Sequence, residues 1–207
     1  MPVSYGTLLR AGLALLLLAL VLWPQGFAPV FAPFAPPGGP VIYTRASLLS
    51  LSLGHLGLVA VATLASTVVA VLLAILVTRP AGAAFRPLSR TLTNVGQTFP
   101  PVAVLALAVP VLGFGTGPTL VALFLYGLLP IFENAMTALS TLPPRTMEAA
   151  RGMGLNRWQQ LWQVELPLAA PVMLAGIRLS AVIGLGTATI GSTVAARTLG
   201  EVIIAGL

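Results

Sequence analysis

Charged side chains are scarce in this sequence, and two of them lie inside long apolar stretches. Glu133 and Arg178 are the only acid and base in such positions. If those stretches cross a bilayer, each charge costs about 2.5–3.5 kcal/mol near the bilayer centre, so each needs a partner or water. The two residues therefore fit either a translocation path or a structural ion pair, and snorkelling to the interface is a third interpretation.

Residues for enzymatic chemistry are few. The sequence has one histidine, His55, and it has no cysteine, aspartate or lysine. An aspartyl protease is thereby excluded, and a serine–histidine dyad would depend on His55, which we expect to be interfacial, without a nucleophile motif nearby. The phosphate-binding loop of an ATPase requires a Gly-Lys-Ser/Thr sequence. We predict no catalytic residue, metal site or cofactor in this chain, and we expect Glu165 and Glu201 to be solvated.

The composition indicates a membrane protein. Hydrophobic residues make up 57% of the 207 positions, charged residues make up 7%, and the mean hydropathy is +1.02. A soluble domain carries roughly 25% charged residues to cover its surface, so most of this surface must face lipid. The net charge of +6 comes from arginines strung between apolar runs rather than gathered on one face, which argues against a nucleic-acid partner.

About five apolar stretches are long enough to cross a hydrocarbon core of roughly 30 Å. They cover residues 8–23, 56–77, 91–112, 119–138 and 168–192. Residues 24–40 are too rich in proline to continue a helix, and we expect an external loop there. We interpret the first stretch as a retained helix rather than a cleaved signal peptide, and we expect the third to bend around Pro100 and Pro101.

The arginines predict the orientation of the chain. With the N-terminus in the cytoplasm, seven arginines lie on the cytoplasmic side and only Arg45 and Arg197 lie outside, as the positive-inside rule requires. The cytoplasmic set is Arg10, Arg79, Arg86, Arg90, Arg145, Arg151 and Arg157. We therefore expect a multi-pass protein of the inner or plasma membrane with a cytoplasmic N-terminus.

Residues 142–168, between the fourth and fifth stretches, are the most informative part of the chain. A first short helix is expected after two prolines and should end at Gly152 and Gly154. A second is expected over residues 155–164, and Pro167 should end it before the next span. Its apolar stripe consists of Leu155, Trp158, Leu161 and Trp162. On periodicity alone, the two helices could lie against lipid headgroups.

The spacing within these residues is specific. The pattern extends over twenty positions and consists of Glu148, Ala149, Ala150, Gly154, Val164, Leu166 and Pro167. It resembles the signature loop of permease subunits in binding-protein-dependent ATP-binding-cassette (ABC) importers, with Val164 where isoleucine is usual. The resemblance implies that this loop forms coupling helices, which dock into a cleft on an ATPase subunit.

The resemblance also implies roles and partners. Glu148 would make a polar contact with the ATPase, the two alanines after it would permit close approach, and Gly154 would supply the turn. Leu166 and Pro167 would return the chain to the membrane. ATP and Mg²⁺ would bind the partner ATPase, whose closure would move the loop and the attached spans. Further implied partners are an extracytoplasmic substrate-binding protein and a second permease copy, as a homodimer or with a paralogue.

Other runs resemble one group of these permeases, which imports glycine betaine, choline, carnitine and related osmoprotectants. The runs are residues 97–100, 111–135 and 148–154, within a resemblance that covers roughly residues 55–207. Methionine-type permeases share the loop but lack the run from Tyr126 to Pro130, so methionine or another small amine is the alternative cargo. Candidate residues of the translocation path are Gln97, Tyr126, Glu133, Asn134 and Arg178. Tyr126 could line a cation path through its ring face or serve helix packing.

The sequence departs from that group in three places. Glu133-Asn134 stands where arginine-asparagine is usual, and residues 195–200 replace a glycine-rich turn. Permeases of this group continue with another helix after the position of Leu207, which implies either a shortened protein or a lost helix.

The predicted fold class is all-α, a polytopic transmembrane bundle like that of type I ABC importer permeases. Residues 1–50 would hold the first helix and the proline-rich external loop, and residues 51–207 the permease domain with the coupling loop at 142–168. A secondary transporter is disfavoured because the sequence shows neither internal repeats nor paired intramembrane charges.

Overall fold

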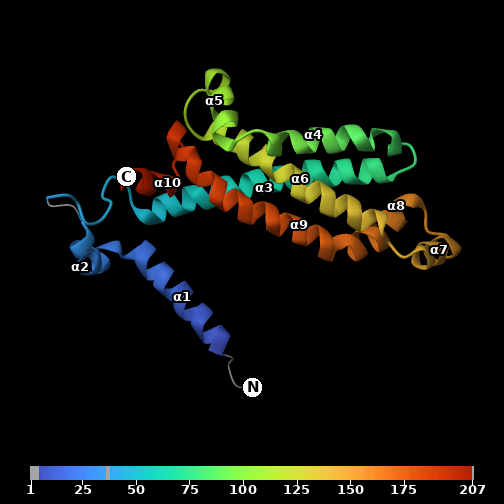
Figure 1. The fold of residues 1–207 in the computed structure, drawn as a ribbon. Helices are drawn as coiled ribbons and strands as arrows, with labels where there is room; N and C mark the ends of the chain where they lie inside the picture. The colour runs from blue at the N-terminus through green and yellow to red at the C-terminus, as the bar shows by residue number, and fades with distance from the viewer. Residues whose placement is uncertain (1–4, 36–37, 207) are drawn as a thin grey trace.

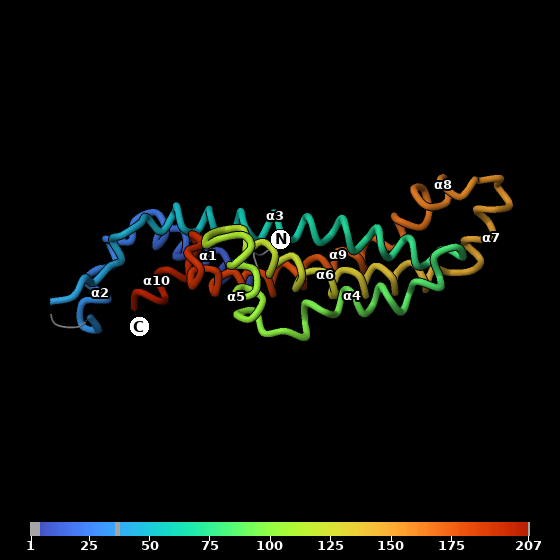
Figure 2. Tube along the Cα trace, turned by 90° about the horizontal axis from the view of Figure 1, so that it is seen from above, coloured from blue at the N-terminus to red at the C-terminus, as the bar shows by residue number. Residues whose placement is uncertain are grey.

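The computed structural model describes residues 5–35 and 38–206, and in those ranges it contains helices and turns without a strand. Four helices are long and apolar enough to cross a membrane, and one bent pair supplies up to a fifth crossing. Helices α3, α4, α6 and α9 lie side by side as one bundle (Figures 1 and 2), whereas α1 projects away from it (Figure 1). The predicted all-α transmembrane bundle is confirmed.

The N-terminal part consists of one long helix followed by three short ones. These are α1 (Tyr5–Leu22), η1 (Pro24–Phe27), α2 (Ala28–Phe31) and η2 (Ala32–Phe34). None of the residues in α1 is buried. Each short helix carries a proline in its first two positions, where a missing amide costs nothing, but no long helix can run through prolines so closely spaced.

Helix α3 (Leu48–Thr78) begins earlier than the predicted residue 56 because Ser47 caps it. The Ser47 hydroxyl oxygen accepts a hydrogen bond of 3.2 Å from the amide of Ser50. His55 lies in this added part, and its interfacial depth stays a prediction, because burial within the bundle concerns packing and not depth in the membrane. His55 is buried against α9, where its Nε2 donates to the carbonyl oxygen of Leu185 at 3.0 Å.

The third crossing is broken rather than bent. It consists of η3 (Ala83–Phe85), α4 (Arg86–Thr98) and α5 (Pro101–Leu112). The two α-helices meet at 96°, and the first of them begins at Arg86 rather than near Thr91. Phe99 and Pro100 both have extended backbone, because a residue before a proline is pushed out of the helical region. Pro101 then starts α5 at a position where it needs no amide donor.

Helix α6 (Thr116–Ser140) is the centre of the bundle, and α3, α4, α5 and α9 all pack against it. Its residues Ile131, Phe132 and Ala135 are fully buried in the largest apolar core cluster. The turn before α6 contains Gly115 at φ +120, a backbone angle that favours glycine. The amide of Gly115 donates to the carbonyl oxygen of Val194, which fixes this turn to the end of the last long helix.

The remaining elements are α7 (Pro144–Gly152), α8 (Arg157–Gln160), the π-helical turn η4 (Leu161–Glu165), α9 (Leu166–Thr187), η5 (Ala188–Val194) and α10 (Gly200–Ala205). From Arg157 to Val194 they form one helix of 38 residues. The prediction that Pro167 ends a separate second helix is therefore wrong. The π turn ends at Glu165, two residues before Pro167, and widens the helix, so the proline ring is accommodated.

Candidate functional site

The segment α7–α8 projects from one end of the bundle (Figures 1 and 2). Its first helix begins at Pro144 and ends at Gly152, as predicted. Glu148 and Ala149 are exposed on it, whereas Ala150 is buried. Ala150 accepts a hydrogen bond from the amide of Leu155 through its carbonyl oxygen, which folds the segment back on itself. The exposed acid and small side chain leave a protruding face on which another protein can pack closely.

The turn between the two helices is held by local hydrogen bonds. Gly154 sits at φ +79, in the left-handed region that glycine occupies without strain. Asn156 and Gln159 then form a reciprocal capping box, with bonds of 2.8 and 2.9 Å between each side chain and the other residue's amide. The segment is therefore ordered without any contact from a partner.

The predicted apolar stripe of the second helix is divided between two environments. Leu161 is buried, but Trp158 and Trp162 are 70% and 65% exposed. Trp158 and Leu161 line a hollow together with Ile75 and Arg79 of the neighbouring helix end. The two indole rings thus remain available to a partner or to lipid headgroups, and of the predicted stripe Leu161 is buried and Leu155 is half-buried.

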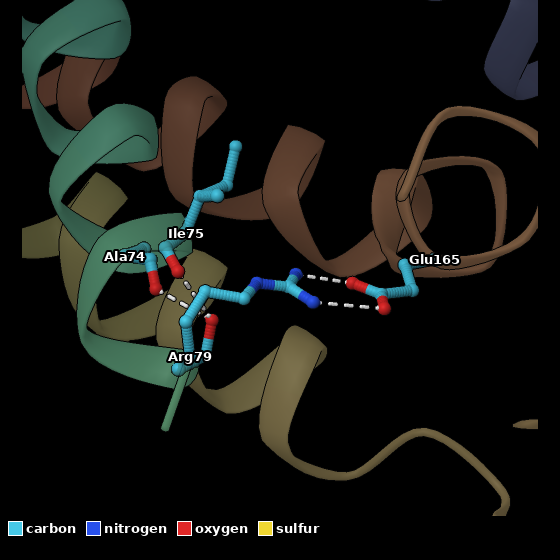
Figure 3. A network of polar contacts seen from close by, with 5 residues as sticks. Ala74, Ile75, Arg79 and Glu165 are labelled. Atoms are coloured by element: carbon cyan, nitrogen blue, oxygen red, sulfur yellow. Dashed lines mark hydrogen bonds and ion pairs between the residues drawn. The ribbon is translucent and has the colours of Figure 1, made fainter. Parts of the chain in front are cut away.

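A partly buried ion pair joins the end of α3 to the π turn before α9. Both terminal nitrogens of Arg79 donate to the carboxylate of Glu165, one of them to Oε1 at 2.9 Å (Figure 3). The Glu165 side chain is only 7% exposed and that of Arg79 is 33% exposed. The hydrogen bond to Glu165 raises the pKa of Arg79, so its guanidinium stays charged.

The prediction that Glu165 is solvated is wrong, and that for Glu201 holds only in part. Glu165 follows Val164 directly and stands in an apolar surrounding, but its partner Arg79 lies 86 positions away in the sequence. Glu201 is half-buried and accepts a hydrogen bond of 3.2 Å from the hydroxyl of Tyr43. Among the described residues, histidine and acidic side chains nowhere gather in threes that could hold a metal ion.

Gln97 and Tyr126 connect the broken third crossing to α6 by two hydrogen bonds. Pro130 has no amide, so the carbonyl oxygen of Tyr126 loses its normal helical donor four residues later. Gln97 donates to that oxygen through Nε2 at 2.8 Å. In return, the Tyr126 hydroxyl donates to the carbonyl oxygen of Phe99, which lies in the break. Gly96 permits this approach, because a Cβ there would collide with the backbone of Leu125.

Replacing Gln97 by leucine is expected to lower the stability of the bundle. It leaves the Tyr126 carbonyl oxygen unpaired in an apolar place, at a cost of about 1–3 kcal/mol. Thermal unfolding of the purified protein in detergent measures the effect. The Thr98→Ala variant is the control, since the Thr98 hydroxyl bonds only to the carbonyl oxygen of Val95 in its own turn.

A second substitution makes this test specific. Pro130→Ala restores the missing amide, so the double variant Gln97→Leu/Pro130→Ala should recover most of the lost stability. Equal losses with and without Pro130 would show that Gln97 acts by some other contact.

The other three candidate path residues have different environments. Glu133 forms an ion pair with Arg90 of α4, with Nε and Oε1 3.0 Å apart and side chains 35% and 54% exposed. Asn134 donates to the carbonyl oxygen of Pro130 at 2.8 Å within its own helix. Arg178 of α9 is exposed and makes no ion pair with any described residue. The five candidates therefore do not meet in one site.

The profile of a family described as "Binding-protein-dependent transport system inner membrane component" matches residues 66–207. The chain belongs to this family. It is thus a multi-pass inner-membrane component of a binding-protein-dependent transport system, a permease subunit of the ABC importer type.

Individual relatives of this permease are similar over most of its length. The osmoprotectant import permease protein OsmY of Salmonella typhimurium is 42% identical over 193 residues, which cover 93% of this chain and 77% of the relative. The glycine betaine/carnitine/choline transport system permease protein OpuCB of Bacillus subtilis is 37% identical over 147 residues, which cover 68% of each chain. The choline transport system permease protein OpuBB of the same organism is 36% identical over 170 residues, 82% of this chain and 74% of the relative.

A solved structure supports the fold of the permease. An inward-facing form of the MetNI methionine ABC transporter contains a chain that superposes with a TM-score of 0.64 at 23% identity, over 74% of this chain and 77% of that one. At this identity the likeness concerns the arrangement of helices, which agrees with the predicted importer-type fold.

Proposed function

We propose that this permease moves quaternary-ammonium osmoprotectants, such as glycine betaine, carnitine and choline, through the membrane in an ATP-driven importer. The observation that carries the proposal is the 42% identity to an osmoprotectant permease over 93% of the chain. Two further relatives bear the names of these solutes. Methionine is the less supported cargo, because the likeness to the methionine transporter is only 23% in sequence.

The coupling residues of the proposal are those of the protruding segment. Glu148 and Ala149 are exposed there, which suits contact with a separate ATPase subunit that binds ATP and Mg²⁺. Ala150, Gly154, Val164, Leu166 and Pro167 shape the segment and its return into α9. An extracytoplasmic binding protein would deliver the solute, and a second permease copy would complete the path.

The proposed orientation has α7 and α8 in the cytoplasm together with the N-terminus. Arg79, Arg86 and Arg90 belong to the elements at that end of the bundle, whereas Arg197 lies near Gly54 at the other. The arginine-rich end is the cytoplasmic end by the positive-inside rule. The position of the protruding segment and the distribution of charge therefore support the same orientation.

Arg178 is the residue that we place on the translocation path. It lies 13 residues beyond Glu165, about 20 Å along the helix and too far from the cytoplasmic interface to snorkel there. It is on the face of α9 that is turned away from α3 and α6, beside the exposed Leu174 and Val182. A charge at this depth requires water or a partner, which a path between two permeases provides. Its guanidinium would bind the carboxylate of a zwitterionic solute.

Uptake into proteoliposomes tests the proposal. The permease is reconstituted with its ATPase and binding protein, and ATP-dependent uptake of labelled glycine betaine, carnitine, choline and methionine is compared. Uptake of the quaternary amines but not methionine is the expected result. Uptake of methionine alone would contradict the proposed quaternary-ammonium solute. Failure of any ATPase to assemble with the chain would contradict the proposed ATP-driven importer.

A further inference from the structure

The segment α7–α8 has two covalent attachments to the bundle, one to α6 and one through the π turn to α9. Helix α3 is not connected to it along the chain, yet α3 packs along α6 and α9 as part of the same bundle. A push on the segment therefore reaches α6 and α9 through the backbone. It reaches α3 through the packing of that helix against α6 and α9, and at the end of α3 through the side chain of Arg79.

The Arg79–Glu165 pair lies at this junction. Arg79 is the C-cap directly after α3, and Glu165 is the last residue of the π turn. Two parallel hydrogen bonds between a guanidinium and a carboxylate fix orientation as well as distance. Because the side chain of Glu165 is 7% exposed and that of Arg79 is 33% exposed, water and salt screen the attraction less than in a surface pair. The link is therefore stiff compared with a surface ion pair.

The position of the π turn suggests what the ion pair does during a movement of the helices. A π turn is a local irregularity where a helix bends more readily, and such turns are frequent at functional sites. Here the turn lies between α8 and α9, on the route by which the segment would move α9. A bend at residues 161–165 would absorb that movement. The side chain of Arg79, which binds the Glu165 carboxylate at the end of the turn, opposes such a bend.

We propose that Arg79 and Glu165 form a strut, which makes α3 and α9 move together when the ATPase displaces the α7–α8 segment. Both are positioning residues that hold helices rather than the solute. The inference rests on the proposed function, since it requires an ATPase that acts on this segment. Within the described residues, the other ion pair, Arg90–Glu133, joins α4 to α6 and has no part in this link.

The number of solute molecules imported per ATP hydrolysed tests the strut. Proteoliposomes that contain the complete transporter are prepared with wild-type permease, Glu165→Gln and the control Arg90→Gln. Glu165→Gln is expected to retain ATPase activity stimulated by the loaded binding protein, but to import about tenfold less solute per ATP, a typical size for coupling between sites. Arg90→Gln removes an ion pair elsewhere and should leave the ratio unchanged.

The reversed pair Arg79→Glu/Glu165→Arg separates a strut from a simple folding defect. If the ion pair itself transmits movement, the double variant should recover solute imported per ATP relative to either single reversal. An unchanged ratio in Glu165→Gln would overturn the inference. Loss of the ATPase from purified Glu165→Gln permease would also overturn it, because the pair would then be needed for assembly.

The same assay keeps this inference apart from the cargo assignment. If the wild-type transporter imports another solute instead of a quaternary amine, the proposed cargo fails. The ratio of solute to ATP is then measured with that other solute, and the strut is accepted or rejected on that result.

Discussion

The Glu148→Lys permease is expected to lose its ATPase subunit and, with it, ATP-driven uptake. Glu148 is exposed on the protruding α7 and makes no hydrogen bond or ion pair with any described residue, so its replacement should leave the segment folded. At the proposed interface, however, lysine replaces an acid by a base. Removing one member of a close charged contact costs about 2–5 kcal/mol, and reversal adds repulsion, so affinity should fall by at least about 100-fold.

Co-purification of the ATPase with tagged permease measures this loss, with uptake assayed in parallel. Glu201→Lys makes the same change of charge in α10, at the opposite end of the bundle (Figure 1), and should retain the ATPase. Full retention of the ATPase and of uptake by Glu148→Lys would show that α7 docks through other residues.

The Arg178→Gln permease is expected to distinguish between solutes that carry a carboxylate and one that does not. Glycine betaine and carnitine are zwitterions, whereas choline has a hydroxyl group in place of the carboxylate. Loss of a charge-assisted hydrogen bond costs about 1.5–3 kcal/mol, so uptake of the two zwitterions should fall by about 10- to 100-fold. Choline uptake should be unchanged or higher, because a positive charge that repels it has been removed.

Competition between labelled glycine betaine and unlabelled choline in proteoliposomes measures this preference. Arg178→Lys keeps the charge and should retain part of the zwitterion uptake, although it loses the two-pronged geometry of arginine. If Arg178→Gln lowers the uptake of choline and of glycine betaine equally, Arg178 stabilises α9 and does not bind the solute.

The crossings and the protruding segment follow from patterns that extend over few residues. The long apolar stretches around α3 and α6 specify helices by composition alone, and Pro143-Pro144 with Gly154 set the limits of α7 and its turn. These signals are local, so they can be read without knowledge of what packs against them. Predicted helix boundaries are less accurate where a single polar side chain decides them, as the Ser47 hydroxyl does at the start of α3.

The contacts between crossings could not be predicted in the same way. Pro130 shows from sequence that the Tyr126 carbonyl oxygen needs a new donor, but not that Gln97, 29 positions earlier, supplies it. Glu165 looks like a solvated acid at a helix start until α3 brings Arg79 to it. In both cases the partner is chosen by the packing of helices distant in sequence, which no local pattern encodes. The continuous helix at Pro167 likewise depends on a π turn, a tertiary accommodation that no local sequence pattern shows.

The helix from Arg157 to Val194 is longer than the membrane is thick. Its 38 residues measure about 57 Å at roughly 1.5 Å each, against a hydrocarbon core of roughly 30 Å. A tilt of about 10° around its midpoint moves the two ends by about 5 Å in opposite directions, nearly one helical turn. If the space beside this helix narrows at the α8 end, it therefore widens at the η5 end. A tilt of this kind would open a pathway to one side of the membrane while closing it to the other, without a change in the helix itself.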